Sequence, residues 1–365
     1  MIILPLSEKR LEDYYQSAIK LLKDLIRSPS FSREEGDTGF ILSNTLKANG
    51  IFFERKYNNF WMRNKYFNAN KPTLLLNSHH DTVKPNDGYT LDPFDPLIKD
   101  GKLLGLGSND AGASLVALFY AFFHYYEADL PINIVFAVTA EEEISGSKGL
   151  MSILTDLESI DYALVGEPTE MKMAIAEKGL LVLDVYTKGK SGHAASELGE
   201  NAIYKAIEDI AWFKHYDFER KSSTLGSVNM SVTMIEAGYQ HNLVPDTCHF
   251  VVDVRTTDVY THAEILGRID QETSSLIRPR STHLNPSSLS QDHIFLQVAN
   301  IMGIHQFGSA TLSDQCLMPF SSVKMGPGLS ERSHSPDEFI YLDEIKWGIK
   351  GYIEFINTLS KIVSK

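Results

Sequence analysis

Five short segments of the sequence carry side chains of the kinds that bind divalent metal ions. The first is His79-His80-Asp81, directly after an apolar run at residues 73–77. An imidazole binds a metal ion through one ring nitrogen, and a nearby carboxylate can orient it by accepting the N–H of the other. His79 and Asp81 are two residues apart, so in an extended strand they project to the same side. Taken alone, the triplet could equally make hydrogen bonds to loop backbone.

Three more segments place carboxylates next to apolar stretches. A carboxylate has two oxygens and can bridge two cations, whereas adjacent carboxylates repel one another unless cations or water relieve the charge. Each segment also has an ordinary interpretation, as a helix cap or as a solvated acidic loop. The three are Asp110 in the glycine-rich turn at 105–112, Glu141-Glu142-Glu143 after the apolar run at 132–138, and Glu167 within 165–169.

The fifth segment is a late loop at residues 333–338, which carries His334. By itself such a histidine is more often solvated or bonded to backbone than bound to a metal. Together, however, the five segments supply two imidazoles and several carboxylates, a set that suits zinc, cobalt or manganese. A pair of such ions can hold both an attacking water and a carbonyl oxygen. The sequence therefore predicts a metal-dependent hydrolase.

The elements that position these segments alternate between helix and strand. Apolar residues at helical spacing predict helices over residues 11–27, 37–49 and 342–359. The uninterrupted apolar runs at 73–77 and 132–138 are typical of strands in a sheet that helices cover on both faces. Ligand sites of such sheets lie at the carboxyl ends of the strands. We therefore expect an α/β fold with its chemistry at those ends.

The pattern of the chain changes near Lys178. Period-2 and helical patterns there predict strands over 180–187, 227–235 and 247–255 and helices over 201–213 and 260–276. This combination indicates an α+β unit inserted into the first domain. We expect a catalytic domain made of residues 1–177 and 286–365, interrupted by an inserted domain at 178–285.

Composition argues against several other classes of protein. The 365 residues carry a formal net charge of −13, and no run of Lys and Arg marks a phosphate-binding face, so we expect no nucleic-acid partner. The longest apolar runs are shorter than the roughly 18 residues that span a bilayer, so we expect no membrane partner. Cys248 and Cys316 are too few for a disulfide framework or a thiolate metal site. Without an export signal at the start, we expect a cytoplasmic protein.

The ordered motifs, with an inserted domain between the segments of Glu167 and His334, resemble the M20 family of metallopeptidases. Within that family the chain looks like the acetylornithine deacetylases and related enzymes that deacylate small N-acyl amino acids. The resemblance spans nearly the whole chain. It implies a zinc-peptidase-like mixed sheet covered by helices, an inserted ferredoxin-like domain that serves as lid and dimerisation surface, a homodimer, and two divalent metal ions, zinc or alternatively cobalt.

The resemblance assigns a role to each motif in turn. Asp81 is implied as the residue that orients His79, and Glu142 as the general base. Asp110 is implied as the ligand that bridges the two ions. The complete set of implied metal ligands is His79, Asp110, Glu143, Glu167 and His334.

Three departures from the family pattern bear on this assignment. His80 adjoins His79, and Glu141 adds a third glutamate to the acidic run, so the register of both motifs is open to alternatives. The family's His-x-Asp spacing and its acidic-Glu-Glu order select His79, Glu142 and Glu143. A third departure follows Asp110, where Ala-Gly-Ala replaces the Met-Lys-Gly that is common in the family. That change affects the local turn and leaves the ligand in place.

Three residues of the inserted domain also match family segments. His193, in the sequence Gly-His-Ala, resembles a histidine that reaches across a dimer to stabilise the oxyanion. Asn242 and Arg255 resemble residues that hold the carboxylate of the substrate. Each has an ordinary interpretation as well: a loop histidine, a turn asparagine and a surface arginine.

These assignments predict hydrolysis of the amide bond of a small N-acyl amino acid. The first expectation is conversion of N-acetylornithine to ornithine and acetate, a step of arginine biosynthesis. Other activities of the family are alternatives: deacylation of N-acetylcitrulline, N-acyl-lysine or succinyl-diaminopimelate, or carboxypeptidase or dipeptidase activity. An alternative from a different class is a non-catalytic, metal-stabilised dimeric binding protein, which would be expected to lack the base or a ligand.

Overall fold

The computed structural model describes residues 6–196 and 198–364, and these divide into two compact units. Unit 1 comprises the chain up to Ile175, the segment Leu289–Phe307 and the chain from Ser313 onward. Unit 2 comprises Ala176–Ser288 together with the short segment Gly308–Leu312. Within the described residues, no helix is both long and apolar enough to cross a membrane.

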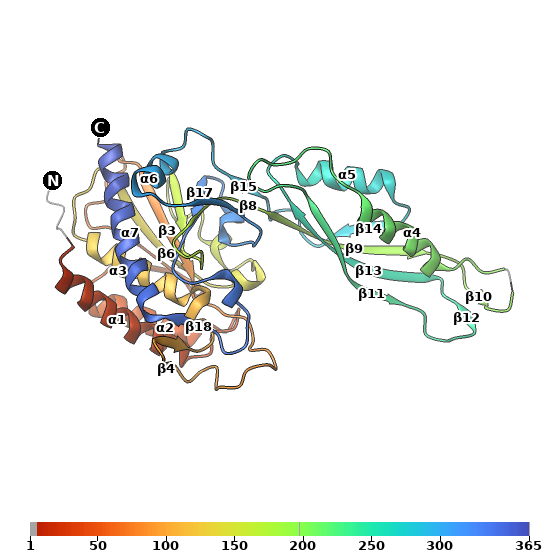
Figure 1. The fold of residues 1–365 in the computed structure, drawn as a ribbon, viewed down its shortest axis with the longest axis horizontal. Helices are drawn as coiled ribbons and strands as arrows, with labels where there is room; N and C mark the ends of the chain where they lie inside the picture. The colour runs from red at the N-terminus through yellow and green to blue at the C-terminus, as the bar shows by residue number, and fades with distance from the viewer. Residues whose placement is uncertain (1–5, 197, 365) are drawn as a thin grey trace. The chain divides into compact units, whose positions relative to one another are not determined.

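Unit 1 is built on a mixed sheet in which the strands lie in the order β1-β2-β6-β3-β7-β17-β8 (Figure 1). Strands β6, β3, β7 and β17 are mutually parallel, whereas β2 is antiparallel to β6. The bounds are β1 (Glu54–Lys56), β2 (Asn59–Arg63), β3 (Thr73–His79), β6 (Asn133–Thr139), β7 (Tyr162–Val165), β8 (Met173–Glu177) and β17 (Ser321–Lys324). Every residue of β3 and of β6 is buried, as expected of strands covered on both faces.

Helices α1, α3 and α7 pack against one another, and α3 contacts strands β3 and β6 (Figure 1). The helices of unit 1 are α1 (Glu8–Ile26), α2 (Gly36–Ala48), α3 (Ala113–Tyr125), α6 (Ile294–Met302) and α7 (Leu342–Val363). A second apolar cluster, which includes Leu75, Val135, Leu150 and Ile153, forms a separate part of the core. The predicted α/β class, a mixed sheet covered by helices, is confirmed, and so are the helices predicted near both ends of the chain.

The remaining strands of unit 1 are short. Strands β4 (Leu97–Lys99), β5 (Lys102–Leu104) and β18 (Phe339–Tyr341) form a small antiparallel sheet. Strand β16 (Gln306–Ser309) pairs with β8; β15 (Ser287–Ser288), which belongs to unit 2, pairs with Ala176 and Glu177 at the end of β8. The small sheet matters for the site, because the loop that precedes β18 carries His334.

Unit 2 is an α+β unit with an antiparallel sheet in the order β11-β13-β9-β14. Its elements are β9 (Gly179–Lys188), β10 (Gly192–His193), α4 (Ala202–His215), β11 (Asn229–Ala237), β12 (Leu243–Val244), β13 (Thr247–Thr256), α5 (His262–Glu272) and β14 (Leu276–Pro279). Apolar residues of α4 and α5 form one core with alternate residues of β9 and β13. The helix predicted over 260–276 ends early at Glu272, because Thr273 is extended and Leu276 pairs with β9.

Candidate metal and active site

The five predicted segments of unit 1 meet at the carboxyl ends of the parallel strands. His79 is the last residue of β3, the acidic run starts two residues after β6, and Glu167 lies two residues after β7. Parallel strands present their carboxyl ends at the same edge of a sheet, so these side chains converge. The loops that carry Asp110 and His334 reach the same edge.

Two groups of three potential ligands are formed there, and Asp110 belongs to both. His79, Asp110 and Glu167 each offer one ligand atom, and these atoms lie within 4.8 Å of one another; the same holds for Asp110, Glu143 and His334. Asp110 Oδ1 lies 3.3 Å from His79 Nε2, and its Oδ2 lies 3.6 Å from His334 Nε2. The two oxygens of one carboxylate therefore face different triads, which is the geometry of a bridging ligand.

The remaining distances within the triads are similar. His79 Nε2 is 3.7 Å from Glu167 Oε1, and His334 Nε2 is 3.0 Å from Glu143 Oε2. An imidazole and two carboxylates per triad suit zinc, cobalt or manganese. The residues present thus fit two divalent cations.

Backbone contacts set the tautomer of His79. Its Nδ1 lies 2.9 Å from the backbone carbonyl of Asp81, which can only accept a hydrogen bond, so Nδ1 carries the proton. Nε2 is therefore the ring nitrogen that faces Asp110 and Glu167 and could bind a metal ion. The carboxylate of Asp81 is farther away, 3.5 Å from Nδ1. The carbonyl of Asp81 is thus the closer orienting group, where the resemblance implies its carboxylate.

The carboxylate of Asp81 also makes hydrogen bonds to the backbone of the acidic run. It accepts hydrogen bonds from the backbone N–H of Glu142 at 3.1 Å and of Glu143 at 3.2 Å, and from the hydroxyl of Ser32 at 2.7 Å. Burial acts to raise the pKa of this carboxyl, but the imidazole of His79, followed by the bonds from Ser32 and the N–H of Glu142, keeps it below its usual value. Asp81 therefore connects the segment of His79 to the turn that carries Glu142 and Glu143.

The three glutamates of the acidic run face different surroundings. The carboxylate of Glu141 points back into the turn and accepts a hydrogen bond from the backbone N–H of Lys148 at 3.2 Å. Glu142 Oε2 lies 3.9 Å from His79 Nε2, and Glu143 contacts His334. Only Glu142 and Glu143 of the run lie beside the triads, as the chosen register expects.

His80 points away from the site. Its Nδ1 lies 2.9 Å from the hydroxyl of Thr38, and its Nε2 lies 2.9 Å from the backbone carbonyl of Asn58. Because β3 is extended, adjacent side chains project to opposite faces, so only one histidine of the pair can face Asp110. That residue is His79.

Asp110 is held by Glu338 rather than by a helix cap. The N-cap position of α3 is Gly112, so Asp110 does not have the ordinary capping role. The buried carboxylate of Glu338 accepts the backbone N–H of Gly107 at 3.0 Å, of Asn109 at 2.8 Å and of Asp110 at 2.9 Å. Three bonds from one side chain fix the loop that presents the shared ligand.

The turn before Asp110 requires a glycine. Gly107 has a φ of +74°, in the left-handed region, and a Cβ there would lie 2.6 Å from Cγ2 of Thr82. The left-handed backbone and the close approach of Thr82 therefore explain the glycine at position 107.

Sequence reasoning assigned no role to two buried carboxylates at the site, Glu338 and Asp314. Glu338 lies in the His334 segment, and only its contacts with a loop more than 200 residues away reveal its role. Asp314, 3% exposed, accepts a hydrogen bond from Thr139 at the end of β6. No apolar strand or metal-binding spacing precedes Asp314 in the sequence, so no signal marked it.

In the metal-free site, the pKa values of several side chains are raised, so these side chains hold their protons to higher pH than usual. Burial raises the pKa of Glu142 well above its usual value, and that of Glu167 to about 8, with nearby carboxylates adding to both shifts. The hydrogen bond to Glu143 raises the pKa of His334 to about 9. Divalent cations would relieve the same repulsion by replacing these protons.

In unit 2 the three predicted residues fall into two groups. His193 on β10 is exposed, and β10 pairs with β12 directly after Asn242. The N–H of Ala194 donates to the carbonyl of Asn242 at 3.0 Å, so His193 and Asn242 lie in neighbouring segments. Arg255 is the second-last residue of β13, and its guanidinium pairs with both carboxylate oxygens of Asp253 at 2.8 and 3.0 Å.

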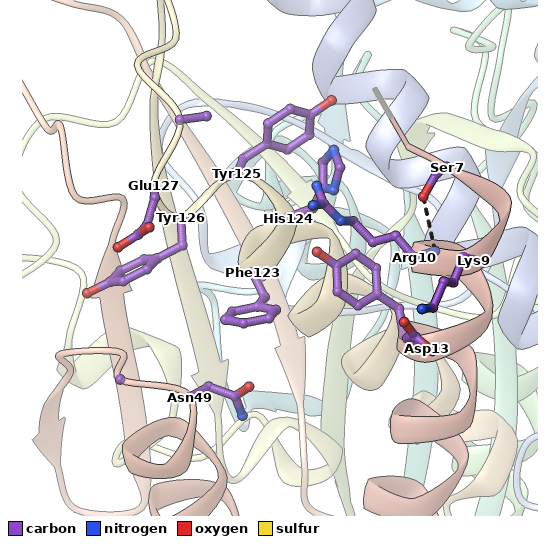
Figure 2. Close-up of a pocket in the computed structure, with 13 residues that line it drawn as sticks. Ser7, Lys9, Arg10, Asp13, Asn49, Phe123, His124, Tyr125, Tyr126 and Glu127 are labelled. Atoms are coloured by element: carbon purple, nitrogen blue, oxygen red, sulfur yellow. Dashed lines mark hydrogen bonds between the residues drawn. The ribbon is translucent and has the colours of Figure 1, made fainter. Parts of the chain in front are cut away.

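A separate hollow of about 760 Å³ lies beside the start of α1 and the end of α3 (Figure 2). It is lined by charged and aromatic residues, among them Lys9, Arg10, Asp13 and Glu127. His124 is the one imidazole among its lining residues, and the ligand triads found among the described residues lie elsewhere. The chemistry is therefore placed at the strand ends.

Comparison with known families decides between the possible classes. The sequence profile of peptidase family M20/M25/M40 matches residues 75–358, which is most of the chain. The chain belongs to this peptidase family. It is thus a metallohydrolase of the M20 type, as the ordered motifs predicted.

Solved M20 structures and other similar folds agree in architecture. The aminopeptidase PepT of Bacillus cereus matches with a TM-score of 0.78 at 18% identity, over 94% of this chain and 98% of that one. An M20 metallo-carboxypeptidase of Sulfolobus solfataricus gives 0.75 at 17% identity, over 98% and 100%. A dinuclear metal-binding M20 peptidase of Bacillus subtilis gives 0.70 at 15% identity, over 97% and 99%. At these identities the likeness establishes the fold and leaves the substrate open.

We predict that metal affinity rises with pH between about pH 6 and about pH 9. Glu167 and His334 have raised pKa values in the metal-free site, so below those values they hold protons that an entering cation must displace. Titration calorimetry with cobalt(II), in buffers of different ionisation enthalpy, measures both affinity and proton release. An affinity that is constant or falls over this range contradicts the prediction.

We also predict that Glu338→Gln weakens binding of the metal ions by roughly 10- to 100-fold, the usual effect of losing a residue that supports a ligand. The amide keeps one acceptor oxygen, but its nitrogen cannot accept the backbone N–H bonds that the other carboxylate oxygen accepts from the Asp110 loop. The matched control is Glu344→Gln, which removes a carboxylate that pairs with Arg332. Equal metal affinity in the two variants would show that Glu338 does not support Asp110.

Proposed function

We propose that the chain is an amidohydrolase that uses two divalent metal ions, zinc or alternatively cobalt. The observation that carries the proposal is the pair of ligand triads that share Asp110, with the partly buried carboxylate of Glu142 beside them. His79 and Glu167 would hold one ion, Glu143 and His334 the other. Ions bound there would act as Lewis acids that polarise the amide carbonyl and make water a better nucleophile.

Glu142 is the proposed general base and acid. It is not a member of either triad, and its carboxylate lies beside them, 3.9 Å from His79 Nε2, so it is free of metal ligation and available to take up and release a proton. In the proposed reaction, the oxygen of a water molecule bonds to the acyl carbon as Glu142 takes a proton from that water. The C–N bond then breaks, and Glu142 delivers the proton to the departing amine.

The proposed substrate is a small N-acyl amino acid, and N-acetylornithine is the first compound to test. Hydrolysis would give ornithine and acetate, a step of arginine biosynthesis. Arg255 and Asn242 are proposed to bind the α-carboxylate of the substrate, because a guanidinium presents two parallel N–H donors to a carboxylate. In the free chain Asp253 occupies these donors, so substrate binding would exchange one carboxylate for another.

A second candidate function, cleavage of small peptides, has specific support. Similar solved structures include an aminopeptidase, a carboxypeptidase and a tripeptidase, the last with a TM-score of 0.77. The substrate panel therefore pairs N-acetylornithine, N-acetylcitrulline, an N-acyl-lysine and succinyl-diaminopimelate with dipeptides and tripeptides. The metal-loaded chain should release amine from a member of the panel. A chain that binds metal and cleaves none of them would be better described as a binding protein.

We further propose a homodimer in which each active site receives His193 and Asn242 from the partner. His193 and Asn242 adjoin the Thr247 end of β13, whereas Arg255 is eight residues further along the strand. At about 3.3 Å per residue this is roughly 26 Å, more than a small N-acyl amino acid can span. One substrate can thus meet both groups only if they come from different chains.

Exposed apolar residues of unit 2 support an interface there. Tyr204 and Ile207 are exposed on α4, and Met234 and Ile235 are exposed on the edge strand β11. Unpaired edge strands and exposed apolar patches are features of protein interfaces.

Glu142→Ala is predicted to lower kcat by at least about 10²-fold while two metal ions remain bound, because it removes proton transfer and no ligand. Glu143→Ala should lose metal as well as rate. Atomic absorption and amine release measure both quantities. Equal metal content in the two variants would contradict the assigned register of the acidic run.

Mixing inactive subunits tests the cross-subunit role. A dimer that contains one His193→Ala chain and one Glu142→Ala chain has one site with both residues intact, so activity should return as subunits exchange. Mass-tagged subunits show independently whether exchange occurs. Mixed dimers without activity would place His193 outside the chemistry or within its own chain's site.

A further inference from the structure

The turn that carries Glu142 is held along its length by polar side chains. The carboxylate of Asp81 accepts hydrogen bonds from the backbone N–H groups of Glu142 and Glu143. In addition, the N–H of Ala140 donates to Oδ1 of Asn59 at 2.9 Å. The N–H of Glu141 donates to the carboxylate of Glu35 at 3.2 Å. The turn starts at Thr139, the last residue of β6, and there the side chain is held by Asp314.

Asp314 lies in the short helical turn Asp314–Leu317 of unit 1, and its carboxylate is buried. The hydroxyl of Thr139 donates to Oδ2 of Asp314 at 2.7 Å. With its amide placed to satisfy its neighbours, Asn77 also donates to Oδ2, at 3.3 Å. Asn77 lies two residues before His79 on β3, so one carboxylate joins the ends of the two strands that carry the first metal ligand and the base.

The burial of this charged group calls for a reason. A buried carboxylate is costly unless it is hydrogen-bonded, and an apolar side chain would satisfy packing alone. Among the described residues, Asp314 belongs to neither ligand triad. Two of its hydrogen bonds go to residues at the ends of β6 and β3, so they tie these strand ends to the turn that carries Asp314.

Resting on the proposed function, we propose that Asp314 is a positioning residue that fixes the base Glu142 through Thr139. Without the carboxylate, the Thr139 hydroxyl has other acceptors, the amide oxygen of Asn77 at 3.0 Å and the carbonyl of Ser78 at 3.4 Å. The end of β6 would then shift without unfolding, and Glu142, three residues on, would move with it. Misplacement of a catalytic group by about 1 Å can cost on the order of 10²-fold in rate.

Four variants of the metal-loaded chain test this role on the best substrate of the panel. Asp314→Ala and Thr139→Val should each lower kcat on the order of 10-fold or more, with KM and metal content unchanged. Thr139→Ser keeps the hydroxyl and should retain kcat. Asp314→Asn keeps an acceptor oxygen and should lose less than Asp314→Ala. The double variant of Asp314→Ala and Thr139→Val should be no slower than the slower single variant, because both remove the same contact.

Additive losses in the double variant, or a wild-type kcat in folded Asp314→Ala, would overturn the proposal. Calorimetric melting shows whether each variant is folded, and a loss confined to stability would indicate a merely structural role. Glu142→Ala is measured alongside. If it is as active as wild type, or if the wild-type chain cleaves no member of the panel, the proposed function itself fails; if only Asp314→Ala is unaffected, this inference alone fails.

Discussion

The carboxylate of Asp110 is the interaction on which the site depends, because its two oxygens face two different imidazoles. His79 lies on one side and His334 on the other, each with a further carboxylate nearby. This concentration of negative charge at one edge of a sheet is unfavourable unless protons or cations compensate it. Burial, with repulsion between neighbouring carboxylates adding to it, raises the pKa of Glu142 and of Glu167 in the metal-free chain. A pair of divalent cations would remove this repulsion and create the hydrolytic site at once.

Around this centre, buried carboxylates outside the two triads hold the backbone segments that carry Asp110, Glu142 and Glu143. Glu338 accepts hydrogen bonds from three backbone N–H groups of the Asp110 loop, and Asp81 accepts them from two neighbouring N–H groups of the acidic run. Each carboxylate accepts several backbone N–H bonds, so moving any one ligand would break bonds elsewhere. Such supporting groups determine how precisely a metal site is formed. The inferred role of Asp314 extends the same principle to the end of β6.

The sequence predicted the fold class and the motifs because both leave local patterns. Uninterrupted apolar runs marked β3 and β6, and polar residues at their carboxyl ends marked the site. The choice of His79 over His80 relied on a spacing rule, and alternation along an extended strand is its physical basis. The chain's membership of the M20 family rests on the profile match over residues 75–358, which contains these motifs.

The remaining features depend on contacts between distant parts of the chain. Asp314 meets Thr139 across 175 residues, and nothing in its own neighbourhood indicates that contact. The pairing of Arg255 with Asp253 is close in sequence, but their side chains meet only because β13 places both on one face of the sheet. The end of α5 was misplaced because Leu276 fits a helical spacing and pairs instead with β9. Tertiary packing decides such cases over local propensity.

The central claim is that Asp110 bridges two metal ions, and anomalous diffraction from crystals of the zinc-loaded chain tests it most directly. Data collected on either side of the zinc absorption edge locate the ions without any assumption about activity. The account predicts two peaks about 3.5–4 Å apart on either side of the Asp110 carboxylate. One ion should be ligated by His79 and Glu167, the other by Glu143 and His334. A single peak, or peaks ligated by other residues, would contradict it.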